Sequence, residues 1–142
     1  MLNAILLPID LSHTDGARRA ISVAVEMAQA HRAVLHVMTV VPSFGMSIVG
    51  SYFEKDFEKR ALTDAEAQLR SFCEQAIPAG IETHPHVAHG AIYDEIIRGA
   101  DKLGCDTIVM AAHRPELRDY LLGPNAARVV RHAKQSVFVI RD

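Results

Sequence analysis

The alternation of short apolar runs with stretches of helical periodicity constrains the fold more than any other feature of the sequence. Five short apolar runs stand out: Ala4–Ile9, Ala33–Val41, roughly Glu82–Val87, Thr107–Ala112 and Ser136–Ile140. Several of them are nearly continuous in apolar residues, which is typical of strands that are buried on both faces of a parallel sheet. We therefore expect five strands in one sheet.

Between the strands, apolar residues recur at helical spacing in four segments: Asp15 to about His31, about Glu54 to Ile77, Tyr93–Leu103 and about Asn125 to Ala133. Ser12, Thr14 and Asp15 are candidate N-caps of the first helix. Pro78 is expected to end the second helix and Gly104 the third. This order implies right-handed crossovers and an α/β doubly wound sheet with helices on both faces.

Length and charge limit the possible classes of protein. The 142 residues correspond to a single domain, residues 1–142, and 49% of them are apolar. The 15 Lys and Arg residues are balanced by 17 Asp and Glu residues, which excludes a general nucleic-acid binder. The sequence has no run long enough to span a membrane and no secretory signal, so we expect a cytoplasmic protein without a membrane partner.

Cysteines and histidines give no metal-binding pattern. Cys73 and Cys105 lack a metal-ligand spacing, and we interpret them as reduced thiols. His84, His86 and His89 lie close together around the third predicted strand. The first two share one strand face and the third falls on the other, so a third ligand is not evident and we predict no metal site.

Several segments resemble the universal stress protein family. The sequence ILLPIDLS is similar to the family's opening strand and LHV to its second strand; the remaining resemblance lies in DTIVMAAH, YLLG, VVRHA and SVFVI. These segments are Ile5–Ser12, Leu35–Val37, Asp106–His113, Tyr120–Gly123, Val129–Ala133 and Ser136–Ile140. The resemblance covers essentially the whole chain, and it looks closest to a branch with AxHRP and YLLGxNAA variants. It implies a single-domain, open five-stranded parallel sheet with strand order 3-2-1-4-5.

The resemblance also implies an adenine nucleotide (ATP, ADP or AMP) as a sensor or regulatory ligand in the stress response. The family's nucleotide motif is altered here. Its first glycine aligns with Ala111 and its second with Arg114, whereas the third is present as Gly123. The Ser or Thr that normally follows is replaced by Pro124, with Asn125 next.

By the same resemblance, Asp10 is similar to a nucleoside contact, and Pro8 and Val37 match positions that flank the base. Met110 completes the predicted set of contacts. A carboxylate at the end of the first strand can accept hydrogen bonds from a ribose hydroxyl or an adenine amino group. The alternative for Asp10 is a cap on the following loop and helix. The alternative for Pro8 and Val37 is sheet core, which is compatible with a ligand contact.

Gly123 precedes the last predicted helix, where free backbone N–H groups and the helix dipole favour a phosphate. Pro124 removes one such donor, so we expect no strong preference for a triphosphate; alternatively, Pro124 simply starts the helix. Arg114 can replace the lost donors, with Arg118 a weaker candidate, although both can be solvated loop residues. His113 can contact a ligand but lacks the partner of a general base.

Catalytic motifs are absent from the sequence. It has no nucleophile elbow, no Walker lysine motif and no paired carboxylates, so we predict no enzyme and at most slow, incidental ATP hydrolysis. The irregular segments Pro42–Phe53 and His113–Gly123 follow predicted strands, at the sheet edge where ligands bind.

The last strand is expected at a sheet edge, and the family resemblance implies a homodimer through Ser136–Arg141. Arg141 and Asp142 can instead blunt the edge of a monomer. The second hypothesis for function is a dimeric interaction module that acts on an unidentified protein partner without a nucleotide.

Overall fold

The computed structural model of the chain describes residues 2–42, 54–112 and 124–141. Five residues that the sequence analysis singled out, namely His113, Arg114, Arg118, Gly123 and Asp142, lie outside this described part. The same holds for most of the irregular segment Pro42–Phe53, of which only the first residue is described.

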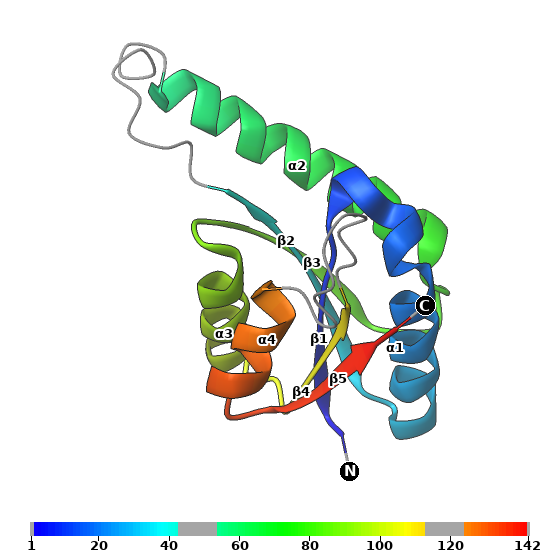
Figure 1. Cartoon of the computed structure of the whole chain (residues 1–142). Coiled ribbons are helices and arrows are strands. Elements are labelled where there is room, and N and C mark those ends of the chain that lie inside the picture. The colour runs from blue at the N-terminus through cyan, green and yellow to red at the C-terminus, as the bar shows by residue number, and fades with distance from the viewer. Residues whose placement is uncertain (1, 43–53, 113–123, 142) are drawn as a thin grey trace.

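The core of the molecule is a five-stranded sheet (Figure 1). Its strands are β1 (Ala4–Pro8), β2 (Val34–Val41), β3 (Thr83–His89), β4 (Thr107–Ala111) and β5 (Ser136–Ile140). All neighbouring pairs are parallel, and the order is β3-β2-β1-β4-β5. The predicted fold class and strand order are confirmed.

Helices cover both faces of this sheet. They are the 3-10 helix η1 (Leu11–Ala17) and the α-helices α1 (Arg18–His31), α2 (Glu54–Ala76), α3 (Ile92–Lys102) and α4 (Pro124–His132). The helices α1 and α2 pack on one face, whereas α3 and α4 lie together on the other. Among the described residues, none of these helices has the length and apolar character needed to cross a bilayer.

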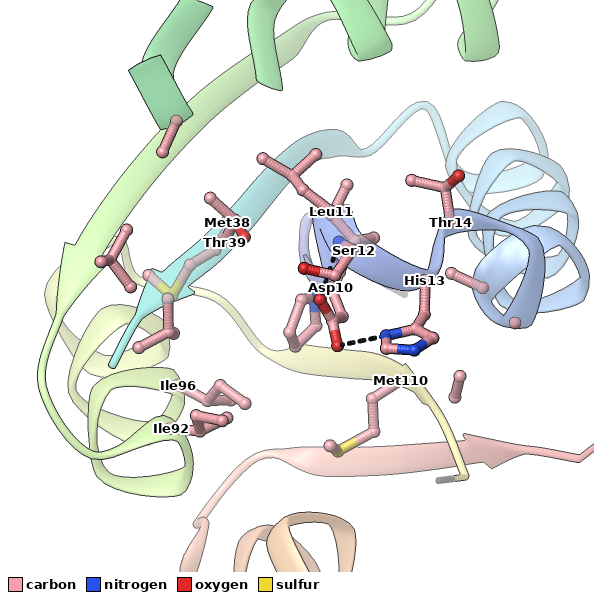
Figure 2. Close-up of a pocket in the computed structure, with 18 of the residues that line it drawn as sticks. Asp10, Leu11, Ser12, His13, Thr14, Met38, Thr39, Ile92, Ile96 and Met110 are labelled. Atoms are coloured by element: carbon pink, nitrogen blue, oxygen red, sulfur yellow. Dashed lines mark hydrogen bonds and ion pairs between the residues drawn. The ribbon is translucent and has the colours of Figure 1, made fainter. Parts of the chain in front are cut away.

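The start of the first helix differs from the prediction. None of the expected caps, Ser12, Thr14 and Asp15, caps α1, whose N-cap is Ala17 without a side-chain hydrogen bond. Asp10 is the N-cap instead, but of η1, because its Oδ1 accepts the backbone N–H of Ser12 at 2.9 Å (Figure 2). The short Asp side chain reaches the backbone two residues ahead and forms a local turn before any α-helix can begin.

A second local feature separates η1 from α1. His13 has a φ of −139° and a ψ of 56°, so the backbone is not helical there. A continuous helix from Asp15, as expected from the apolar spacing, is therefore wrong: α1 starts at Arg18. The apolar periodicity is real, since Ala17, Ala20 and Ile21 are buried, but it continues across two distinct helices.

The third strand is longer than expected. The apolar pattern predicted an end at Val87, whereas β3 continues to His89. The extra length follows from pairing, because β2 runs to Val41 and its last residue is the register partner of His89. Gly90 then closes the ladder: its N–H donates to the carbonyl of Val41 at 3.0 Å, and its φ of +143° is one that glycine adopts readily.

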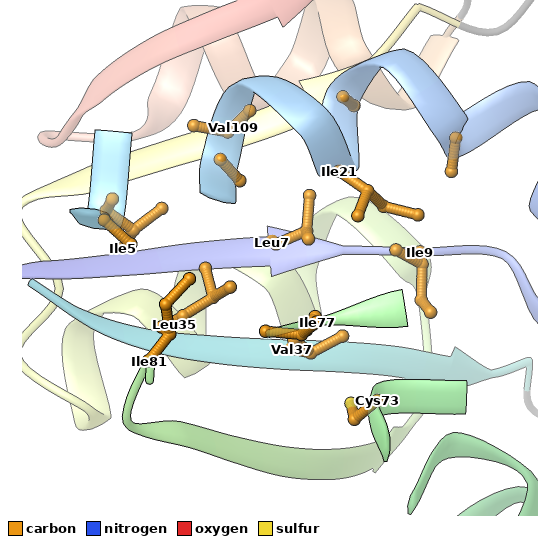
Figure 3. Close-up of a cluster of buried hydrophobic side chains, with 14 of the residues drawn as sticks. Ile5, Leu7, Ile9, Ile21, Leu35, Val37, Cys73, Ile77, Ile81 and Val109 are labelled. Atoms are coloured by element: carbon orange, nitrogen blue, oxygen red, sulfur yellow. The ribbon is translucent and has the colours of Figure 1, made fainter. Parts of the chain in front are cut away.

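Two hydrophobic clusters fill the space between the sheet and the helices. Alternate residues of β1 serve different clusters, since Ile5 and Leu7 face α1 and α2 whereas Leu6 faces α3 and α4. Figure 3 shows the first cluster, in which Leu35 and Val37 of β2 pack beside the β1 side chains. These side chains have no solvent exposure, and each contributes roughly 1.5–3 kcal/mol by its burial. The sheet is therefore a rigid support for residues at its edge.

Candidate functional site

A pocket of about 980 Å³ opens at the carboxyl ends of the strands. Its lining comes from the end of β1 and the following η1, the second half of β2, the start of α3 and the end of β4 (Figure 2). The strand order reverses between β1 and β4, and open α/β sheets bind ligands at this switch point. The fold thus places the pocket where the sequence analysis expected a function.

The structure brings together four of the predicted site residues. Pro8 and Asp10 at the end of β1, and Met110 and Ala111 at the end of β4, all line this pocket. They are adjacent because β1 and β4 are paired, although about one hundred residues separate them in the sequence.

Three further predicted residues belong to the described part of the chain, and none of them is in the described lining. Val37 is fully buried in the core on the side of α1 and α2 and does not line the pocket, so the alternative of sheet core describes it. Pro124 is the first residue of α4, which agrees with the alternative of helix initiation, and Asn125 follows it half-buried. Neither is part of the described lining.

Asp10 and Asp15 are the two carboxylates of the described lining, and Asp10 is the one that follows β1. One of its oxygens, Oδ1, accepts the N–H of Ser12, and the other, Oδ2, lies 3.2 Å from Nδ1 of His13. The side chains of Asp10 and His13 are 65% and 76% exposed. Each carboxylate oxygen can accept two hydrogen bonds, so acceptor capacity remains for a ligand. The cap and the ligand contact, posed as alternatives from the sequence, are therefore compatible.

The opposite wall of the pocket is apolar. Met38 of β2, Ile92 and Ile96 of α3 and Met110 of β4 form it, and Thr39 lies beside them (Figure 2). An apolar surface that faces a carboxylate suits a ligand with a flat apolar part and a hydroxyl-bearing part. The sequence analysis missed all of these residues except Met110, because no local motif marks them.

Gly99 explains how Met38 fits against α3. A Cβ at Gly99 would overlap the Sδ–Cε end of Met38. The missing side chain lets the helix approach β2 closely, and this approach sets the position of the apolar wall.

Neither cysteine contributes to the pocket. Cys73 and Cys105 are free and buried, and both lie outside the lining. Burial, with a smaller effect of the adjacent Asp106, raises the pKa of Cys105 to about 11. Burial, followed by the charge of Glu74, also raises the pKa of Cys73. Both side chains therefore remain thiols at neutral pH and are poor nucleophiles.

The histidines of β3 point as the strand alternation predicts. His84 and His86 share one face, and His89 is on the other, where its Nε2 lies 3.8 Å from Oε1 of Glu58 on α2. The sequence analysis missed His36 of β2, whose Nδ1 is 2.9 Å from Nε2 of His86. Within residues 2–42, 54–112 and 124–141, no group of three or more His, Cys, Asp or Glu side chains is arranged to hold a metal.

The family model of the universal stress proteins matches residues 1–141. The chain belongs to this family. It is 31% identical to universal stress protein G of Shigella flexneri over 144 aligned positions, which cover 99% of this chain and all of that protein. The resemblance stated from the sequence motifs is thereby confirmed.

Solved universal stress proteins share the same fold. UspA from Lactobacillus plantarum superposes with a TM-score of 0.76 at 26% identity, over 98% of this chain and 97% of that one. Two more distant solved structures are complexes with nucleotides. One is the Archaeoglobus fulgidus protein in complex with dAMP (TM-score 0.61, 23% identity, 97% of each chain). The other is a universal stress protein in complex with cAMP (TM-score 0.63, 20% identity, 99% and 97% of the two chains).

Proposed function

We propose that this universal stress protein binds an adenine nucleotide in the pocket at the ends of β1 and β4, as a sensor or regulatory ligand. The observation that carries the proposal is the exposed carboxylate of Asp10 facing an apolar wall in a pocket of about 980 Å³. The volume is within the range of small-molecule sites. The dAMP and cAMP complexes of two relatives by fold support adenine as the base.

The two sides of the pocket match the two ends of a nucleoside. We propose that the base packs against the apolar part of the lining, above all against Ile92, whose side chain is 38% exposed, because the aromatic faces of the base are apolar. The ribose hydroxyls then donate to Asp10 on the opposite side. Pro8 and Ala111 also line this pocket, and we propose that they contact the nucleoside.

The phosphates are proposed to extend toward the start of α4. Gly123, Arg114 and Asn125 are the proposed donors there. Pro124 is the first residue of the helix and has no backbone N–H, so a full set of helix N-terminal donors is not available to a terminal phosphate. We therefore infer that the affinities for AMP, ADP and ATP are similar.

We propose binding rather than catalysis. His13 and Asp10 are the histidine–carboxylate pair of the pocket, and both are more than half exposed. Catalytic acid–base pairs are commonly desolvated, because desolvation shifts their pKa values toward the operating pH. Hydrolysis of a bound nucleotide, if measured, is expected to be slow and incidental.

Assembly as a homodimer through β5 is part of the proposal. Within the described sheet, β5 pairs only with β4, so its outer edge is available to a second copy. Phe138 on this strand is 43% exposed, and a large apolar side chain at a free edge favours pairing. A two-fold axis would bring the same strand of both copies together.

The decisive experiment begins with the purified protein. It is denatured, any released nucleotide is identified by chromatography, and the nucleotide-free protein is titrated with AMP, ADP and ATP by calorimetry. We expect adenine nucleotide binding with similar affinities across the series. A steep rise in affinity from AMP to ATP would contradict the inference about Pro124. Absence of both retained nucleotide and binding would favour the second hypothesis, a nucleotide-independent dimeric module.

A further inference from the structure

Three histidines gather between β2 and β3, on the sheet face that carries α3. His36 of β2 is the register partner of His84 of β3, and the two rings stack with their centroids 5.5 Å apart. The third ring, of His86, is 5.0 Å from that of His36. We call His36, His84 and His86 the histidine cluster. None of the three lines the nucleotide pocket.

One hydrogen bond inside the cluster depends on protonation. Nδ1 of His36 and Nε2 of His86 are 2.9 Å apart, which is a hydrogen-bond distance. One nitrogen must donate its N–H and the other must accept with its lone pair. If both rings are protonated, both nitrogens carry a hydrogen, and attraction is replaced by repulsion. The bond therefore requires at least one neutral ring.

The surroundings disfavour the charged form. Burial lowers the pKa of His36, and the neighbouring His86 and His84 lower it further, against a smaller opposing effect of Glu82. The carboxylate of Glu82 is already engaged, since its Oε2 is 2.8 Å from Nε2 of His84.

The pKa of His86 is lowered as well. Its pKa is lowered by burial first, then by His84, and then by Lys102 of α3. The helix α3, which packs over this face, therefore brings the positive charge of Lys102 close to His86. On the other side, β1 presents the apolar Leu6 beside His36.

The cluster lies on β3, an edge strand whose pairing with β2 runs over all seven of its residues. In the described sheet β3 is an edge strand, which pairs only with β2 and packs against α2 with its other face. We propose that the histidine cluster is an acid-sensitive latch, which holds β3 to β2 when its rings are neutral and releases β3 when they become protonated.

The pH dependence of stability follows from the difference in proton binding between the folded and the unfolded chain. Because the pKa values of His36 and His86 are lowered in the folded protein, the unfolded chain binds more protons as the pH falls through 6.5, the ordinary value. The stability that the neutral rings of His36 and His86 contribute is fully present above pH 6.5. It is lost as the pH falls through their lowered pKa values. Each ring can change the unfolding equilibrium by up to roughly tenfold per pH unit.

The first test is an NMR titration of the histidine rings in the wild-type protein. We expect His36 and His86 to titrate with midpoints below 6.5. Midpoints at or above 6.5 would overturn the proposal. This measurement needs no substitution, so it can overturn the proposal even where a variant fails to fold.

The second test compares pH profiles of unfolding by urea between pH 7.5 and 5. The double variant His36→Gln/His86→Gln keeps polar side chains that do not titrate. The control is His132→Gln, at a histidine that is exposed on α4. We expect a flatter profile for the double variant and a wild-type profile for the control. Amide exchange in β3 of the wild type, corrected for intrinsic rates, should accelerate at pH 5 more than in β1. Equal profiles, or equal acceleration in the two strands, would refute the latch.

Discussion

The two edge strands of the sheet differ in character. β3 carries three histidines and Pro85 among its seven residues, and one face of it is polar. β5 contains Ser136 followed by four apolar residues, and Phe138 is 43% exposed. Proline within a sheet is largely confined to edges, because it lacks a donor, and polar side chains discourage a new strand from pairing.

The difference shows that one edge of a sheet can disfavour pairing with a further strand while the other edge permits it. The proline and histidines of β3 hinder addition of a further strand, whereas β5 has apolar side chains and no comparable protection. Between these edges, β1 and β4 supply the pocket. Assembly, ligand binding and response to acid are thus assigned to three separate places on one sheet, and each assignment can be tested.

The largest expected effect contrasts the centre of the sheet with an edge. Leu7→Ala on β1 should lower the free energy of unfolding by about 2–5 kcal/mol, because Leu7 is fully buried and truncation leaves a cavity. Val87→Ala on β3 reaches the same cluster from a half-buried position and should cost about 1 kcal/mol. Urea denaturation measures both. Similar losses would mean that β3 is as tightly packed as the centre.

A charge placed on each edge tests the difference between them directly. Phe138→Lys on β5 should weaken the proposed dimer by about 100-fold, because a two-fold contact brings like charges together. His84→Lys on β3 is the matched control and should leave the assembly unchanged, since that side chain is exposed on the other edge. Sedimentation over a concentration series measures both. Dissociation by the β3 variant alone would reverse the assignment of the edges.

A substitution in the pocket tests ligand binding without changing either edge strand. Asp10→Asn should lower the affinity for AMP by about tenfold, because a hydrogen bond to a charged acceptor is stronger than one to an amide. Asn is also a good N-cap, so stability should change little. Glu26→Gln, on the exposed face of α1, removes the same charge away from the pocket. Calorimetry that gives equal affinities for these two variants would remove Asp10 from the site.

The smallest expected effect concerns the first residue of α4. Pro124→Ser returns a backbone N–H and a hydroxyl to the helix start, next to the proposed phosphates. The affinity for ATP should rise about threefold relative to AMP, since one added hydrogen bond contributes about 1 kcal/mol or less. Competition titrations measure this ratio. An unchanged ratio would place the phosphates away from α4.

Much of the fold was predictable because its signals are local. Short runs marked all five strands to within two residues, and helical spacing marked α2, α3 and α4 to within one residue. The beginning of α1 was not predictable in this way. The side chain of Asp10 and the irregular backbone at His13 compete there with the apolar pattern.

The site was predictable where its residues follow strands. Asp10 and Ala111 stand at strand ends, which in a parallel sheet meet at one edge. Ile92 and Thr39 could not be found, because they reach the pocket only through the packing of α3 and β2. Strand alternation places the side chain of Val37 in the core, and the base contact that the resemblance implies for it stays a prediction.

By itself, the sequence determined the number of strands, the α/β class, the family and the position of the carboxylate at the end of β1. All of these depend on residues that are neighbours in the chain. Only the tertiary structure decided which wall faces Asp10 and that His36 meets His86, fifty residues away. The physical reason is that parallel pairing sets the register between distant segments through the packing of whole strands and helices, which no local pattern records.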